Sequence, residues 1–89
     1  MGVYSECGAP INLSSSGAIS TRPGSLIGFY VNNTSSGTLI LKDGGTSGTA
    51  ITGTITPAIG FHRLPAYFRT SAFATIANTL DVTFFFQAG

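Results

Sequence analysis

Few residues of this 89-residue chain have side chains that could carry out catalysis. His62 is the only histidine, Cys7 is the only cysteine, and the acids are Glu6, Asp43 and Asp81. Nucleophilic catalysis needs a nucleophile, a base and an orienting group held together, and none of the serines lies in a nucleophile elbow. A site made of His62, Asp81 and a serine is the one combination that the composition leaves open. We expect that the protein is not an enzyme.

The same residues offer little to a metal ion or a cofactor. A zinc site needs four ligands, and the chain has one histidine and one cysteine. The segment Lys42-Asp43-Gly44-Gly45 lacks the spacing of a phosphate-binding loop and is predicted to be a hairpin loop. A single aspartate among glycines is also a poor calcium site. We therefore expect no cofactor and no metal.

The charge content points instead to a surface that other proteins cover. Charged residues make up 8% of the chain, against about 25% in ordinary soluble domains. The net charge of +1 gives no electrostatic attraction for nucleic acid or an anionic membrane, and the apolar runs are too short to span a bilayer. One cysteine excludes an internal disulfide, so oligomerisation is the remaining way to stabilise so small a domain. The alternative is that Ser, Thr and Asn make the surface polar enough.

The residue pattern predicts an all-β protein. Thr, Val, Ile, Phe and Tyr dominate, turn residues recur about every 8–12 positions, and no apolar stripe has helical spacing. We expect an antiparallel β-sandwich, jelly-roll-like, with about seven or eight short strands. Residues 1–10 are predicted to form an N-terminal arm and residues 11–89 a single domain. The expected strands are 11–20, 26–32, 38–42, 49–56, 61–64, 69–77 and 79–86.

Alternation within these strands predicts which side chains face the core, because successive residues of a strand point to opposite faces. The predicted inward side chains are Ile27, Phe29 and Val31, then Leu39 and Leu41, then Leu80, Val82, Phe84 and Phe86. In the last strand Asp81, Thr83, Phe85 and Gln87 are predicted to face outward. Asn78 is expected to mark a tight turn before that strand.

Outward-facing aromatic residues are the candidates for contact with other subunits. Phe85 is outward beside little charge, and Tyr67 and Phe68 follow Pro65. A tyrosine ring buries apolar area while its hydroxyl keeps a polar partner. The alternative for Tyr67 and Phe68 is that a short loop folds both onto the core. Tyr4, in the arm, is a further candidate.

Two arginines complete the candidate set. Arg63 and Arg69 are predicted to take part in contacts, with Asp81 as a possible ion-pair partner across strands or between subunits. His62 is expected to be a half-exposed strand residue beside Phe61.

A family resemblance adds to these expectations. Residues 24–43, GSLIGFYVNNTSSGTLILKD, resemble the opening of small virion proteins of tailed bacteriophages, with a Gly-x-Leu-x-Gly strand, a Val-Asn-x-Thr segment, a Gly-Thr step and a Leu-x-Asp ending. Later pieces, from Ile55-Thr56-Pro57 to Leu80-Asp81-Val82-Thr83, are similar to the same group. The resemblance covers about residues 20–86. Each piece consists of common β and turn residues, and the order and spacing are more specific.

The resemblance implies a capsid decoration or cement protein with a jelly-roll-like fold. Such a protein would be made in the host cytoplasm, form a homotrimer and bind the major capsid protein on the outer capsid surface of the virion. It would stabilise the shell after genome packaging. The family has no catalytic motif to transfer. Two alternatives stay open, a carbohydrate-binding module and a neck or tail connector of the same virion.

Overall fold

The computed structural model describes residues 9–88, and every helix or strand in that range is a β-strand. This confirms the all-β prediction. None of the described residues forms a helix that could cross a membrane. Apart from Ala9 and Pro10, the arm predicted at 1–10, with Tyr4 and Cys7, lies outside the described residues. The strands are β1 (Ala9–Leu13), β2 (Gly17–Ser20), β3 (Gly24–Asp43), β4 (Thr49–Ala50), β5 (Gly60–Phe68) and β6 (Ala72–Ala88).

Two long strands form the centre of the molecule. β3 and β6 pair antiparallel over their whole length, from Gly24 opposite Ala88 to Asp43 opposite Ala72. β1 and then β2 pair with the other side of β6. β5 and then β4 pair with the other side of β3. The result is one antiparallel ribbon about four strands wide.

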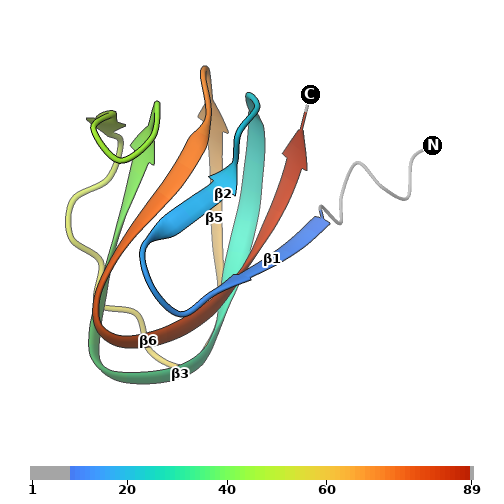
Figure 1. Ribbon diagram of the computed structural model, residues 1–89. Helices are drawn as coiled ribbons and strands as arrows, with labels where there is room; N and C mark the ends of the chain where they lie inside the picture. The colour runs from blue at the N-terminus through green and yellow to red at the C-terminus, as the bar shows by residue number, and fades with distance from the viewer. Residues whose placement is uncertain (1–8, 89) are drawn as a thin grey trace.

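This ribbon bends across its middle, so that its two halves lie opposite each other (Figure 1). The bend falls where β3 and β6 shift register, between Ser35 and Ser36. Ser36 and Asn78 have positive φ angles there, of 56° and 62°. Gly37 is buried beside them, and a Cβ at Gly37 would collide with the carbonyl oxygen of Thr79. Glycine is therefore required where the bent strands approach each other.

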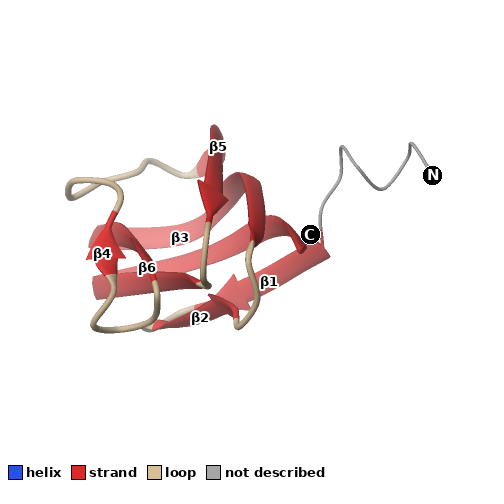
Figure 2. Ribbon diagram, turned by 90° about the horizontal axis from the view of Figure 1, so that it is seen from above, coloured by secondary structure: helices blue, strands red, loops and turns tan. Residues whose placement is uncertain are grey.

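The two halves are the layers of a β-sandwich, seen end-on in Figure 2. The first layer contains β1, the C-terminal half of β6, the N-terminal half of β3 and β5. The second layer contains β2, the N-terminal half of β6, the C-terminal half of β3 and β4. The antiparallel sandwich agrees with the prediction. Its two long strands, β3 and β6, run continuously from one layer into the other.

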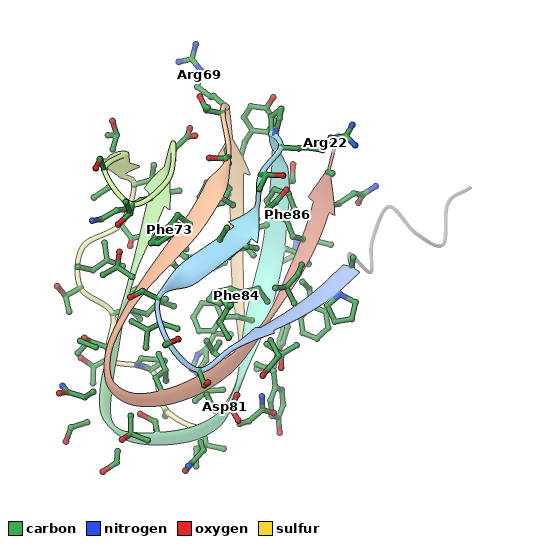
Figure 3. The ribbon with its side chains drawn as sticks, viewed as in Figure 1. Arg22, Arg69, Phe73, Asp81, Phe84 and Phe86 are labelled. Carbon is green, nitrogen blue, oxygen red and sulfur yellow. The ribbon has the colours of Figure 1, made fainter. Side chains whose placement is uncertain are left out.

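The core lies between the layers. The predicted inward side chains are buried, with Ile27 the exception, and Figure 3 shows Phe84 and Phe86 inside the fold. Phe84 packs on Phe29 at a ring-centroid distance of 5.9 Å, and Phe86 packs on Phe68 at 6.0 Å. Removing these large apolar side chains from water is the main stabilising contribution to the fold.

A β-bulge explains the exception. The register of β3 with β6 shifts between Leu26 and Gly28. A bulge adds one residue to one strand, so the residues before it point to the side opposite to the one that simple alternation predicts. Leu26 therefore enters the core at 1% exposure, and Ile27 is only half-buried. The prediction that Ile27 shares the inward face of Phe29 and Val31 is wrong for this reason.

The strand boundaries also differ from the expected ones. Within residues 9–88 six strands form instead of seven or eight, because β3 and β6 each keep pairing through the bend where a turn was expected. Asn78 lies inside β6, and its positive φ bends the strand without ending it. The strand expected at 11–20 is interrupted at residues 14–16.

The two remaining differences from the expected strands concern β5 and β4, which both pair with β3. β5 continues through Pro65, which sits at the register shift between Arg63 and Ala66. Proline is tolerated there because a bulge at a sheet edge needs no amide donor. The strand expected at 49–56 pairs only at Thr49 and Ala50, followed by a single bridge between Ile55 and Leu39.

Candidate protein-interaction surface

The outward side of the first layer carries most of the exposed aromatic rings. Tyr30 in β3, Phe61 and Tyr67 in β5 and Phe85 in β6 all point to this side. The exposed fractions are 43% for Tyr30, 53% for Phe61 and 61% for Tyr67, and Phe85 is half-buried. We call these four residues the aromatic face.

Phe61 and Phe85 contact each other across the strand that separates them. Their ring centroids are 6.1 Å apart, although β3 lies between β5 and β6. Gly28 of β3 is paired with Phe85, and a Cβ built on it would lie 2.8 Å from Cζ of Phe61. The missing side chain therefore gives the Phe61 ring its place over β3.

The apolar surface extends to both sides of this contact. Tyr30 is the direct cross-strand partner of Phe61, and Pro10 of β1 is the partner of Phe85. A strip of apolar and aromatic side chains thus crosses all four strands of the first layer. Strands of a sheet hold such rings in fixed positions, which lowers the entropy lost on binding.

A hydrogen-bonded polar group borders the strip at the end near the bend. Nδ2 of Asn12 donates to Oδ1 of Asp81 at 2.8 Å and to Oγ1 of Thr83 at 3.1 Å. Nδ2 of Asn32 donates to the same Thr83 hydroxyl at 3.0 Å. Interfaces commonly have an apolar centre and a polar border of this kind.

These bonds decide the position of Asp81, which Figure 3 places at the bend. Its cross-strand partner in β3 is Asn33, and its carboxylate is bound to Asn12. The cross-strand ion pair predicted with Arg63 or Arg69 is therefore not formed within the described residues. A pairing between subunits stays a prediction.

The structure brings together some of the predicted contact residues. Tyr67 is exposed, Phe85 points outward, and exposed Arg63 lies beside them, opposite Gly28. Arg69 is exposed and lies, like Arg22, at the end of the molecule opposite the bend (Figure 3). Tyr4 lies outside the described residues.

Phe68 is the one contact candidate that the structure contradicts. Its side chain is 0% exposed and packs against Phe86. β5 continues past Pro65 as a strand, so Tyr67 and Phe68 point to opposite sides. The alternative in which both fold onto the core is also wrong, because Tyr67 faces the solvent.

Sequence reasoning missed Tyr30 and Phe61 as members of the face. The signal for Tyr30 was present, since it alternates with the predicted inward residues Phe29 and Val31. Phe61 was noted only as the neighbour of His62, because its expected strand ended before Pro65.

His62 is half-buried and joins two parts of the fold. It lies opposite Phe29, with ring centroids 5.3 Å apart, and its Nε2 is 2.7 Å from the carbonyl oxygen of Ala58. Its side chain therefore points to the inner side of the first layer, whereas Asp81 is bonded on the outer side. The sheet separates the two groups that the one conceivable catalytic combination requires.

Asp43 has a structural role at the opposite end of the sandwich. Its carboxylate accepts hydrogen bonds from the backbone amides of Arg69, Thr70 and Ser71, at 2.8, 2.9 and 3.2 Å. These amides, Arg69 first, hold the pKa of Asp43 below its usual value. The glycines that follow have positive φ in a loop between β3 and β4, which confirms the hairpin loop predicted there.

Comparison with known proteins gave no similarity. No family model matches the chain, and no curated protein and no solved structure is similar to it at a significant level. The fold and the surface thus define the class, a small antiparallel β-sandwich with an aromatic outer face, and the resemblance to phage virion proteins stays a prediction.

Proposed function

We propose that this protein is a virion structural protein of a tailed bacteriophage, and that it decorates the capsid by binding the outside of the major capsid protein shell. The aromatic face carries the proposal. Three exposed rings share one side of the first layer, and only 8% of the residues in the chain are charged. Aromatic side chains without dense charge are typical of the centre of protein interfaces.

The order of the strands supports the same proposal. The first layer runs β1, second half of β6, first half of β3, β5, and the second layer runs β2, first half of β6, second half of β3, β4. We take this order to be that of a jelly roll, a fold used in viral capsids and in lectins. Fold alone is a weak guide to function, so the aromatic face is the stronger support.

The size of the surface suits a protein that binds in many copies. An aromatic side chain buries about 150–250 Å², so the aromatic face provides part of the roughly 1,000 Å² that a specific interface needs. A trimer would present three such faces to one shell, and multivalency would raise the overall affinity without new contacts.

Co-sedimentation with expanded, empty shells of the encoding phage tests the proposal. We expect the full chain to sediment with the shells, and the double variant Phe61→Ser, Tyr67→Ser to bind at least tenfold more weakly. Ile51→Ser is the control, because Ile51 is 40% exposed and lies after β4, outside the aromatic face. Absence of binding by the full chain, or equal binding by the double variant, would contradict the proposal.

A carbohydrate-binding module is the second candidate. The observation in its favour is that Tyr30 lies opposite Thr83, whose hydroxyl accepts hydrogen bonds from the side-chain amides of Asn12 and Asn32. Sugars bind to aromatic rings flanked by hydrogen-bonding groups. A glycan array with the same variants separates the two, since only this candidate predicts saccharide binding. A neck or tail connector would use the same face at a few positions per virion, so electron microscopy of copy number and location distinguishes it.

A further inference from the structure

β5 is an edge strand of the first layer. It pairs with β3 from Gly24 opposite Phe68 to Val31 opposite Gly60, and no other strand within residues 9–88 pairs with it. The far side of β5 thus presents backbone amides and carbonyls that another strand can bind.

An apolar hollow of about 410 Å³ opens beside this strand. After β4 the chain forms no further strand with β3: it bonds to β3 through Ile51 and Thr52 at Leu41 and through the bridge between Ile55 and Leu39, so the second layer has no full strand opposite β5. His62 and Leu64 of β5 line the hollow, and the exposed residue Arg63 lies at it as well. The lining residues that matter here are Phe29, Ile55, Pro57, His62 and Leu64.

We propose that residues 1–8 of one copy of this chain add as a strand to the free edge of β5 in a second copy. The sequence MGVYSECG has apolar Met1, Val3 and Cys7 at alternate positions, with Tyr4 and Glu6 between them. In an extended strand these two sets point to opposite sides. The first set fills the hollow, and the second joins the aromatic side of β5.

The opposite charges of Glu6 and Arg63 support residues 1–8 as the segment that binds β5. Arg63 is exposed on the outward side of β5. Asp81 is bound to Asn12, and Asp43 is bound to three backbone amides. Glu6 is the third acid of the chain. A strand that places Glu6 beside Arg63 forms a charge-assisted hydrogen bond on the same side of the sheet.

Geometry makes this exchange intermolecular. β1 and β5 are the opposite edges of the first layer, so a segment leaving Ala9 must cross about four strand spacings, about 19 Å, to lie beyond β5. Eight extended residues span at most about 28 Å. The crossing would leave too few residues to pair along the nine residues of β5. When residues 1–8 bind β5 of a second copy, they do not have to cross their own sheet. Repeating this head-to-tail contact from copy to copy closes a ring when the rotation between neighbouring copies allows it.

Light scattering after size exclusion tests the exchange on the full chain, independently of any capsid. The wild-type mass is expected to be a multiple of 9.1 kDa, and deletion of residues 2–8 gives the monomer. Glu6→Arg and Arg63→Glu each raise the dissociation constant roughly tenfold or more, and the double variant Glu6→Arg, Arg63→Glu restores association. Arg22→Glu, at an exposed arginine that precedes β3 and belongs to neither β5 nor the hollow, is the matched control.

The outcomes separate this inference from the capsid proposal. A monomeric wild type, an oligomer that survives the deletion, or a double variant as weak as the single ones overturns the strand exchange. A monomer that still binds shells overturns only the exchange, and an oligomer that ignores shells overturns only the capsid proposal.

Discussion

Phe61 and Phe85 belong to strands that are not neighbours, and their rings still meet at 6.1 Å. Gly28, in the strand between them, makes this contact possible because it has no side chain. The aromatic face is thus built from three strands, β3, β5 and β6, and its residues extend from Tyr30 to Phe85 in the sequence.

Gly28→Val should destabilise the protein by about 2–3 kcal/mol, because forcing carbon atoms into a packed space strains the structure. A Cβ at this position meets the carbonyl oxygen of His62 at 2.6 Å and the Phe61 ring at 2.8 Å. Urea unfolding measures the change. Gly53→Val is the control, since a Cβ at Gly53 has no heavy atom within 4 Å. Similar free energies of unfolding for the two variants would show that Gly28 does not form this contact.

Alanine substitution should distinguish the two neighbouring phenylalanines of β6. Phe84 is 0% exposed in the core, and Phe84→Ala should cost about 3–5 kcal/mol through lost burial and the cavity left behind. Phe85→Ala should cost about 1–2 kcal/mol, because its ring is half-buried on the outer side. Thermal or urea unfolding gives both values, and the reverse order would mean that the register of β6 is shifted by one residue.

Asp43 should make stability depend on pH in the acid range. Its pKa is lowered in the folded state, so its contribution is complete above the unfolded value of 3.8 and is lost as the pH falls through the folded pKa. Asp43→Asn should lower the melting temperature at pH 7, and the difference from wild type should shrink below about pH 4. A difference that stays constant down to pH 2 would exclude an ionised Asp43 as its source.

His62 should hold the segment before β5 in place. His62→Ala removes the bond to the Ala58 carbonyl and the packing on Phe29, and should cost about 1–2 kcal/mol. Amide hydrogen exchange should rise mainly at residues 55–59. His62→Gln keeps a donor at this position and should restore part of the protection; uniform exchange throughout the chain would indicate a general loss of stability instead.

Part of the candidate site was predictable from the sequence. Phe85 was found because alternation in the last strand places it outward. Tyr67 was found because a tyrosine ring suits an interface, and Arg63 because it was a candidate ion-pair partner of Asp81. Phe61 and Tyr30 were not found as members of the same face. Their proximity depends on β5 pairing with β3, which no local pattern specifies.

The sequence by itself determined the all-β class and the inward positions Leu80, Val82, Phe84 and Phe86, because alternation with a period of two is a local property of a strand. Only the tertiary structure decided the bulge at Ile27, the continuous bend at Asn78, the burial of Phe68 and the contact of Phe61 with Phe85. Each of these depends on which strand lies alongside and in which register. Pairing between distant segments is set by the packing of the whole core.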